Sequence, residues 1–401
     1  MRLAPRLLGT ASLVAAAALL LTGCTGDAST TDTSDSATPS PSSSGPAPST
    51  TDPWATWDAA LASVDAEPAR WLALGDSITE GQGASALGTR WVDLARDGLR
   101  AAHPVEGVPG GVGYRPAAFA TYGPDSPWAQ WAGDRRGRTS VDTSTPDLGF
   151  RALELSPGAS LRYDVVGTDL DLWWTPGGGT FRYRVDAGAE QAVDTSVAAS
   201  TTGITSVTGL ASGPHAVTIS VDDDAGSGVV LQGLAQFDGD RDRGVALVDS
   251  ARSGATVSTF TDDLPAFLAA AAAAEPDLVT ITLGANDAVT TGPDELAERY
   301  TTLIEGLQSL DSDPTVLVVD EFTEGLSVTS AWDAPAADYR AALDEVVEQT
   351  GVASVTVDEA LASAGGTDLG ALLSADGLHP NDDGQRVLAA FMTETLARQE
   401  G

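Results

Sequence analysis

Serine, histidine and aspartate residues stand in this sequence where they could form a nucleophilic site. Residues 75–81 read Gly-Asp-Ser-Ile-Thr-Glu-Gly, and residues 376–379 read Asp-Gly-Leu-His. A serine hydroxyl is a poor nucleophile until a base removes its proton, and His379 is one of only three histidines in the chain. Asp376 can accept the Nδ1 proton of this histidine and fix its tautomer. We therefore predict that Ser77, His379 and Asp376 form a catalytic triad.

The predicted elements place these residues at the edge of a parallel sheet. Ser77 follows a short apolar strand predicted at residues 70–74, and alternating strands and helices return after about residue 240. Near-continuous apolar strands separated by helices are typical of a parallel sheet covered on both faces. We predict an α/β fold, a three-layer α/β/α sandwich of the flavodoxin-like type. Its further strands are expected at residues 245–248, 278–283, 315–319 and 353–357, and its helices at residues 90–103, 264–274, 293–310, 335–349 and 383–397.

The segment between about residues 113 and 240 follows a different pattern. Apolar and polar side chains alternate there in short runs, separated by Gly- and Asp-rich turns, at residues 160–166, 169–175, 181–185, 215–221 and 229–237. Several short alternating strands with turn signals indicate a β-sandwich. We predict that an all-β sandwich (jelly-roll-like) module is inserted at residues 113–240 and splits the catalytic domain into residues 53–112 and 241–401.

Tryptophans of this module leave two interpretations open. In the strand at residues 169–175, Trp174 is expected in the core, and Trp173 falls on the opposite face beside two carboxylates. An aromatic ring flanked by polar groups suits stacking on a sugar, so the module could bind carbohydrate. Trp173 could equally pack under a loop or against the catalytic domain. Trp128 and Trp131 leave the same two interpretations.

Four segments of the chain resemble, in order, the four blocks that define the SGNH (GDSL-like) hydrolases. They are residues 75–81, Gly254, residues 284–287 (Gly-Ala-Asn-Asp) and residues 376–380 (Asp-Gly-Leu-His-Pro). The first three follow predicted strands, whose ends cluster in an open α/β sheet. The resemblance covers the catalytic portion, about residues 70–112 and 241–398, and implies a serine esterase.

The resemblance also implies which donors stabilise the tetrahedral oxyanion. They are the backbone N–H groups of Ser77 and Gly254 and the side-chain amide of Asn286. Asp76 and Asp287, the neighbours of these residues, are interpreted as structural supports. The chain departs from the family pattern in two respects. The interval between Ser77 and Gly254 is far longer than usual, which the inserted module accounts for, and the segment around Gly254 lacks the usual asparagine.

The first 52 residues have the composition of an export signal and a tether. A largely apolar core at residues 11–21 follows two arginines and is too short to span a bilayer as a mature helix. It leads into Leu-Thr-Gly-Cys24, which resembles the lipobox of bacterial lipoproteins. The alternative is an ordinary secretion signal, but no Ala-x-Ala site follows the core. We predict a signal peptide at residues 1–23, lipidation of Cys24, and a disordered Ser/Thr/Pro tether at residues 24–52.

A formal net charge of −36, with arginine as the only basic residue type, limits the possible partners. Nucleic acid and anionic membrane surfaces both require a positive patch, so neither is expected as a partner. Contact with the membrane is expected through the lipid anchor on Cys24 alone. The single cysteine excludes an intrachain disulfide. We expect an exported protein on the outer face of the bacterial cell membrane, facing the cell wall.

These patterns together predict a cell-surface serine esterase, with O-acetyl groups of cell-wall or other polysaccharide as the expected substrate. The alternatives are a lipase or thioesterase for longer acyl chains, acyl transfer to a sugar, and a non-catalytic carbohydrate-binding surface protein. A non-catalytic protein of this kind would be expected to have lost Ser77, Asn286 or His379, and all three are present. The chemistry requires no cofactor and no metal. Residues 238–244 hint at a calcium loop but lack its Gly and Glu positions, so an acidic surface turn is preferred.

Overall fold

A computed structural model of the protein describes residues 52–398, apart from residues 124–132, 197–200 and 365–367. The predicted signal peptide, Cys24 and nearly all of the predicted tether lie outside the described residues, as do Trp128 and Trp131. Among the described residues, no helix is both long enough and apolar enough to cross a membrane.

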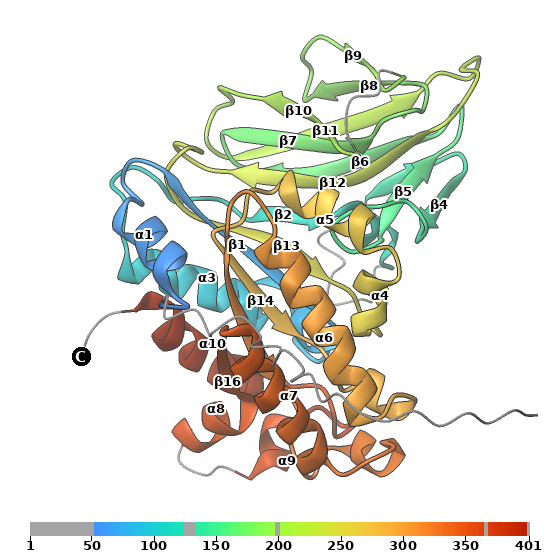
Figure 1. The fold of residues 1–401 in the computed structure, drawn as a ribbon. Coiled ribbons are helices and arrows are strands. Elements are labelled where there is room, and N and C mark those ends of the chain that lie inside the picture. The colour runs from blue at the N-terminus through green and yellow to red at the C-terminus, as the bar shows by residue number, and fades with distance from the viewer. Residues whose placement is uncertain (1–51, 124–132, 197–200, 365–367, 399–401) are drawn as a thin grey trace, which may run out of the picture. The chain divides into compact units, whose positions relative to one another are not determined.

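The centre of the catalytic part is a parallel sheet, as predicted (Figure 1). Strand β1 (Pro68–Gly75) lies between β13 (Gly244–Ala251) and β14 (Leu278–Thr282), and β15 (Thr315–Asp320) and β16 (Ala353–Thr356) follow outward from β14. Numbered along the chain, these five strands have the spatial order 2-1-3-4-5 of flavodoxin-like sheets, with the switch point between β1 and β14. Ligands of such sheets bind at the carboxyl ends of the strands beside this point.

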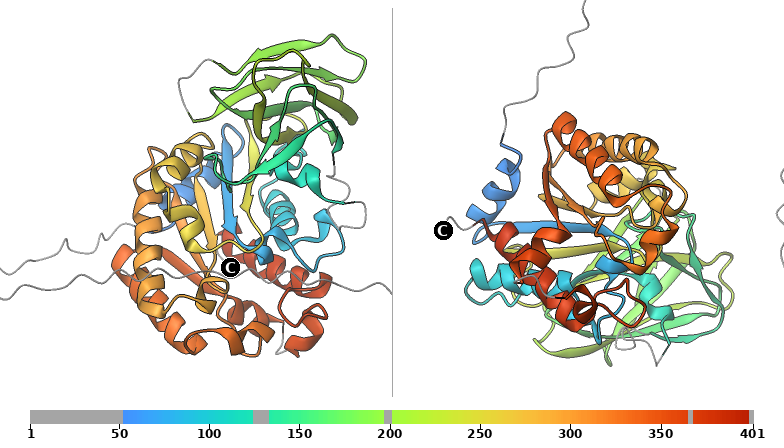
Figure 2. Two further views of the ribbon diagram at one scale, coloured as in Figure 1. Left: turned by 90° about the vertical axis from the view of Figure 1, so that its right-hand side faces the viewer. Right: turned by 90° about the horizontal axis from the view of Figure 1, so that it is seen from below.

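Alternate side chains of β1 enter two separate apolar cores. Leu72 and Leu74 belong to one core, and Trp71 and Ala73 to the other. Because successive side chains of a strand point to opposite faces, a continuous apolar run suits a strand that is covered on both sides. Figure 2 (left) shows the two helix layers. One layer consists of α4 (Val257–Thr261), α5 (Leu264–Ala272), α6 (Pro293–Gln308) and α7 (Ala336–Thr350), and the other of α1 (Ala55–Ala62), α3 (Trp91–Ala102), α8 (Val357–Ser363) and α10 (Asp382–Ala397).

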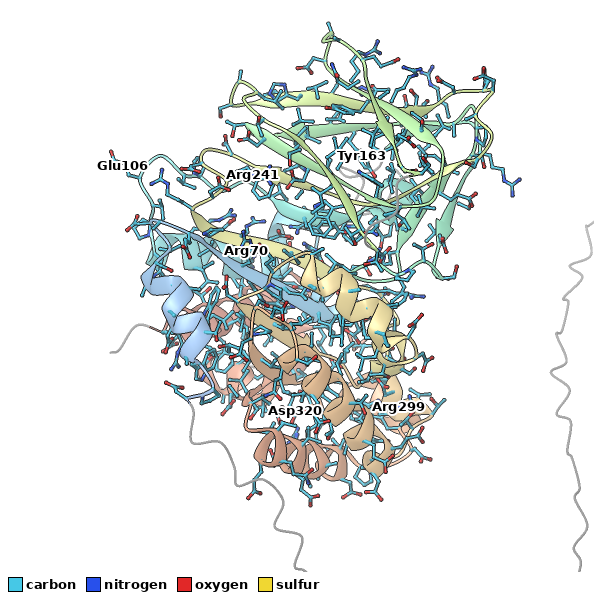
Figure 3. The ribbon with its side chains drawn as sticks, turned by 45° about the horizontal axis from the view of Figure 1, so that its top comes forward. Arg70, Glu106, Tyr163, Arg241, Arg299 and Asp320 are labelled. Atoms are coloured by element: carbon cyan, nitrogen blue, oxygen red, sulfur yellow. The ribbon has the colours of Figure 1, made fainter. Side chains whose placement is uncertain are left out.

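The predicted all-β segment folds into two antiparallel sheets with an apolar core of their own. The inner faces bring together Leu161, Tyr163, Trp174 and Phe181, and Figure 3 labels Tyr163 between the sheets. One sheet contains β4 (Thr139–Asp142), β5 (Ala152–Leu155), β12 (Val229–Phe237), β7 (Asp169–Thr175) and β10 (Gly203–Val207). The other contains β3 (Asp134–Arg136), β6 (Ser160–Val166), β11 (Pro214–Val221), β8 (Thr180–Val185) and β9 (Gln191–Asp194).

The sandwich is hydrogen-bonded directly to the catalytic sheet. Strand β2 (Gly113–Pro116) pairs antiparallel with β12 and parallel with β13, so a single 11-stranded sheet extends from the sandwich to β16. Tyr114 of β2 and Trp173 of β7 pack edge to face with ring centroids 5.1 Å apart, and both belong to the core that contains Leu72. The two parts therefore share backbone hydrogen bonds and apolar contacts.

Candidate active site

The turn after β1 presents Ser77 at the carboxyl edge of the sheet. Ser77 is the first residue of the short helix α2 (Ser77–Glu80), and Asp76 caps this helix by accepting the N–H of Ile78 at 2.8 Å. Gly75 is required by close packing, since a Cβ there would lie 2.3 Å from Oγ1 of Thr79. This sharp strand-to-helix turn brings the Ser77 hydroxyl to the ends of the neighbouring strands.

The structure brings Ser77, His379 and Asp376 into one hydrogen-bonded chain. Nε2 of His379 lies 2.8 Å from Oγ of Ser77, and Nδ1 lies 2.8 Å from Oδ2 of Asp376. The second oxygen of Asp376 accepts the N–H groups of Leu378 at 2.9 Å and His379 at 3.0 Å. The loop that carries these residues follows α9 (Leu369–Leu372) and precedes α10.

The hydrogen bonds around Asp376 favour its ionised form. Partial burial acts to raise the pKa of this carboxyl, but the bonds from the His379 ring and from two backbone N–H groups outweigh it, so the pKa is lowered. An ionised Asp376 is the acceptor that a histidine base needs on its Nδ1 side.

The two further predicted oxyanion donors, Gly254 and Asn286, lie on loops beside the hydrogen-bonded triad. Gly254 is exposed and follows β13. A Cβ at this position would meet no atom within 4 Å, so lack of space does not explain the glycine. Its φ of +77° does, because residues with a Cβ rarely adopt this backbone conformation. Its loop is held against the nucleophile turn by the N–H of Arg252, which donates to the carbonyl of Gly75 at 2.9 Å. Asn286 follows β14, and its Nδ2 lies 2.8 Å from Oδ2 of Asp76 and 3.0 Å from the carbonyl oxygen of Ala255.

Three buried carboxyls lie behind these loops and have raised pKa values. Burial raises the pKa of Asp76 to about 7, helped by the charges of Asp287 and Glu80, and burial raises the pKa of Asp287 to about 6. Burial, with the charge of Asp76, also raises the pKa of Glu321 well above its usual value. Both oxygens of Asp287 accept the N–H of Val257 at 3.1 Å, so Asp76 and Asp287 support loop backbone, as interpreted from the sequence.

Three charged residues that hold the site together were not predicted from the sequence. Glu321 follows β15 and accepts the N–H of Ala285 at 2.6 Å, next to Asn286. Glu80 and Arg151 form a buried ion pair at 3.2 Å beside the Gly254 loop. The position of Glu80 within residues 75–81 was the one available signal, whereas nothing in the local sequence marks Arg151 or Glu321.

The two sandwich tryptophans that the structure describes, Trp173 and Trp174, are both buried. Trp174 lies in the sandwich core, as predicted, and donates from Nε1 to Thr205 at 3.0 Å. Trp173 is only 5% exposed and belongs to the apolar core that contains Leu72 of β1, so it packs against the catalytic domain. Asp240 of the acidic turn pairs with Arg243 at 2.8 Å, and within the described ranges no three His, Cys, Asp or Glu side chains gather as metal ligands.

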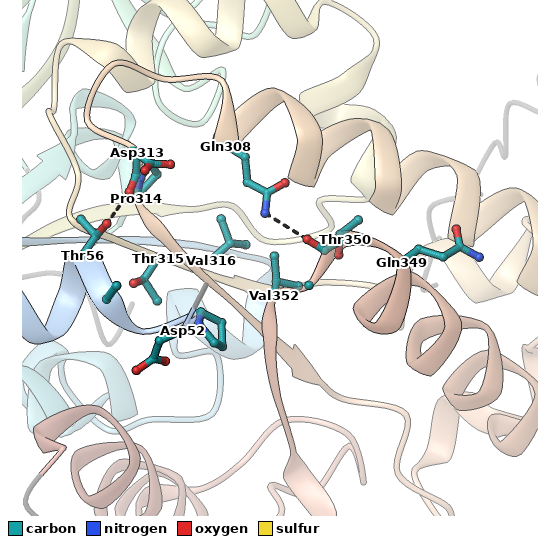
Figure 4. A pocket seen from close by; sticks show the side chains of 13 residues that line it. Asp52, Thr56, Gln308, Asp313, Pro314, Thr315, Val316, Gln349, Thr350 and Val352 are labelled. Atoms are coloured by element: carbon teal, nitrogen blue, oxygen red, sulfur yellow. Dashed lines mark hydrogen bonds between the residues drawn. The ribbon is translucent and has the colours of Figure 1, made fainter. Parts of the chain in front are cut away.

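A pocket of about 300 Å³ lies at the opposite end of the parallel sheet (Figure 4). Its lining includes Thr315 and Val352, at the amino ends of β15 and β16, and Thr56 and Asp313, which are joined by a hydrogen bond of 2.7 Å. No predicted site residue lines it. The apolar pocket behind the His379 loop, lined by Leu378 and Pro380 among others, measures only about 30 Å³.

Comparisons with known proteins identify a sequence family and a similar fold. Residues 214–387 match the sequence profile of the GDSL-like Lipase/Acylhydrolase family. This range contains Gly254, Asn286, Asp376 and His379, whereas Ser77 lies before it. A search of curated proteins found no match.

Among solved structures, a peptidoglycan O-acetylesterase has a similar fold. The two chains are 15% identical with a TM-score of 0.63, and the likeness covers 86% of this chain and 95% of the other. A family two carbohydrate esterase from Clostridium thermocellum is 15% identical, and its likeness covers 65% of this chain and 98% of that chain with a TM-score of only 0.32. The chain thus contains a GDSL-like lipase/acylhydrolase domain and is a carboxylic ester hydrolase.

Proposed function

We propose that this protein is a cell-surface serine esterase that removes O-acetyl groups from a cell-wall or other polysaccharide. The observation that carries the proposal is the unbroken hydrogen-bonded chain from Asp376 through His379 to Ser77, with both distances at 2.8 Å. Such a chain is the arrangement by which a base activates a serine hydroxyl.

In this proposal Ser77 is the nucleophile and His379 the base. The Ser77 oxygen attacks the ester carbonyl carbon while its proton moves to Nε2 of His379. The imidazolium, held by Asp376, then protonates the leaving alcohol, and an acyl-Ser77 ester remains. A water molecule, deprotonated by the same histidine, attacks this ester and releases the carboxylic acid, and the proton returns to Ser77.

The negative charge on the tetrahedral intermediate requires hydrogen-bond donors that are already in place. Among the described residues, no hydrogen bond uses the backbone N–H of Ser77 or of Gly254, so both are available. The Asn286 amide already donates to Asp76 and to the carbonyl of Ala255. We propose that it shares the longer bond, to Ala255, with the oxyanion.

One observation supports an acetyl group on a polysaccharide as the substrate. The fold resembles that of a peptidoglycan O-acetylesterase over 95% of that chain. This likeness favours an acetyl ester over the lipase alternative.

The location and domain boundaries belong to the same proposal. We propose export by the signal at residues 1–23, lipid attachment at Cys24, and a tether at residues 24–52 that lets the catalytic domain reach the cell wall. The catalytic domain comprises residues 53–112 and 241–401, with the β-sandwich module at residues 113–240. Because Trp173 is buried, carbohydrate binding by this module would require another surface.

The proposal is tested with 4-nitrophenyl acetate, butyrate and octanoate and with an O-acetylated polysaccharide. We expect rates that fall with acyl length, release of acetate from the polysaccharide, and a kcat lower by roughly 10⁴-fold or more in Ser77→Ala. Near wild-type turnover by this variant would refute the serine mechanism. A preference for octanoate would refute the acetylesterase assignment and favour a lipase.

A further inference from the structure

Glu80 joins the nucleophile helix to the loop that holds Gly254. Its side chain is only 3% exposed, and its two oxygens have different partners. Oε2 accepts a hydrogen bond from the backbone N–H of Ser253. Oε1 accepts hydrogen bonds from the hydroxyl of Tyr122 and from Nη2 of Arg151, the latter at 3.2 Å. The N–H that follows Ser253 in the chain is that of Gly254, so the bond to Glu80 fixes the peptide unit next to the proposed oxyanion donor.

Arg151 holds the same loop from its other end. Its Nη1 donates to the carbonyl of Ala251 at 2.7 Å, while its Nη2 contacts both Glu80 and the Tyr122 hydroxyl, the latter at 3.1 Å. The guanidinium lies over the ring of Phe119, with 4.7 Å between its central carbon and the ring centroid. Residues 251–253 are thus held between a carboxylate of the nucleophile helix and a guanidinium.

Arg151 and Tyr122 both come from residues 113–240, the segment predicted to be an inserted module. Arg151 directly precedes β5, and Tyr122 follows η2 (Ala117–Thr121), a 3-10 turn that comes after β2. The side chain of Arg151 is 9% exposed, so its contacts with Glu80 and Ala251 are well shielded from water. Shielded hydrogen bonds between charged groups are among the stronger and more directional ones.

We propose that Glu80 and Arg151 are positioning residues that fix the Gly254 N–H for the oxyanion, so that the sandwich segment completes the active site. The inference rests on the proposed function, because it assigns Gly254 to the oxyanion hole. Neither residue touches the substrate in this account. Both act through backbone groups of residues 251–253, and their loss displaces an oxyanion donor without removing the nucleophile or its base.

The test compares Arg151→Met with the matched variant Arg182→Met, which alters an exposed arginine of the same sandwich (39% exposed). For Arg151→Met we expect a kcat on 4-nitrophenyl acetate lower by about 10- to 100-fold, since a displacement of 1 Å can cost that much. We expect the KM to change less than about twofold, because the change affects an interaction made in the transition state. Arg182→Met should match the wild type.

A double-variant comparison separates positioning from general damage to the fold. Gly254→Ala strains a residue whose φ is +77° and should itself lower the kcat. If Arg151 acts through the Gly254 N–H, adding Arg151→Met to Gly254→Ala should lower the kcat much less than it does in the wild type. If the double variant loses as much kcat as the two single variants combined, the inference is overturned.

Glu80→Gln provides a second variant of unchanged size if Arg151→Met does not fold. One amide oxygen cannot accept all three donors that the carboxylate accepts, so a lower kcat with an unchanged KM is again expected. A wild-type kcat in folded Glu80→Gln or Arg151→Met, beside an inactive Ser77→Ala, would overturn the inference and leave the proposed function standing. A wild-type protein inactive on every ester would overturn both.

Discussion

The carboxylate of Asp76 accepts a hydrogen bond from the side-chain amide of Asn286, with 2.8 Å between Oδ2 and Nδ2. The residue before the proposed nucleophile therefore orients a proposed oxyanion donor that lies on a different strand end. The same amide also contacts the carbonyl of Ala255 at 3.0 Å, on the loop after β13. One side chain thus links the ends of β1, β13 and β14.

Asn286→Ala removes this link and the amide donor together. We expect the kcat on 4-nitrophenyl acetate to fall by about 10²–10³-fold, the cost of losing one oxyanion donor. Unfolding by heat, measured beside the kinetics, reports any general damage. An unchanged rate in a folded variant would remove Asn286 from the oxyanion hole.

Asp376→Asn tests the residue that holds the histidine. An amide at this position alters the tautomer and orientation of His379, because its NH2 group cannot accept the Nδ1 proton. We expect a kcat lower by roughly 10³–10⁴-fold with little change in KM. Asp383→Asn, an exposed aspartate in the first turn of α10, is the matched control. A similar kcat in the two variants would argue against the role of Asp376.

Asp287→Asn should change how stability depends on pH. Burial raises the pKa of Asp287 from 3.8 to about 6, so the folded protein binds more protons than the unfolded chain between these values. The stability associated with protonated Asp287 is complete below about pH 4 and is lost as the pH rises through about 6. The asparagine of the variant does not titrate, so the variant does not lose this stability as the pH rises. The difference in free energy of unfolding, variant minus wild type, should therefore increase by up to about 3 kcal/mol from pH 4 to pH 7.

Urea unfolding at several pH values measures this difference. Asp311→Asn, at an exposed position, serves as the control for replacing a carboxylate by an amide. A stability difference between Asp287→Asn and the wild type that is constant from pH 4 to pH 7 would show that Asp287 does not titrate in this range.

Arg90→Met should destabilise the fold strongly. Arg90 is fully buried and donates to Asp249 at 2.8 Å and to Asp93 at 2.7 Å. Burial acts to raise the pKa of Asp93, but Arg115, Arg90 and Arg96 lower it to about 2, so this carboxylate remains charged. Removing one member of a buried ion pair leaves uncompensated charge and costs about 3–5 kcal/mol.

The solvent-facing arginine variant Arg182→Met is again the comparison, and its stability should stay close to that of the wild type. The urea midpoints of the two variants and the wild type give the measurement. Equal midpoints for Arg90→Met and Arg182→Met would show that the buried network contributes no more to stability than a surface pair.

The catalytic fold could be predicted because its signals are local. The apolar run at residues 71–74 indicates a strand covered on both faces, and Ser77 follows it on the turn where such sheets bind their ligands. Asp376 and His379 could be paired because only two residues lie between them and one short loop carries both.

The strand pairing that connects the sandwich to the catalytic sheet could not be predicted. Periodicity identifies strands such as β7 and β12 but not the short strand β2, and it does not show which strands pair, because pairing depends on side chains far apart in the sequence. The same holds for Glu80 and Arg151, whose meeting depends on the finished fold. Trp173 was ambiguous for a related reason, since strand alternation gives the face of a residue but not what covers that face.

Covalent labelling of the serine tests the central claim most directly. The purified protein is treated with diethyl 4-nitrophenyl phosphate, which phosphorylates an activated serine, and is then digested and analysed by mass spectrometry. The proposed mechanism predicts one adduct, on the peptide that contains Ser77, formed together with the loss of esterase activity and greatly slowed in His379→Ala. Loss of activity with the adduct on another residue, or labelling of Ser77 at an unchanged rate in His379→Ala, would contradict it.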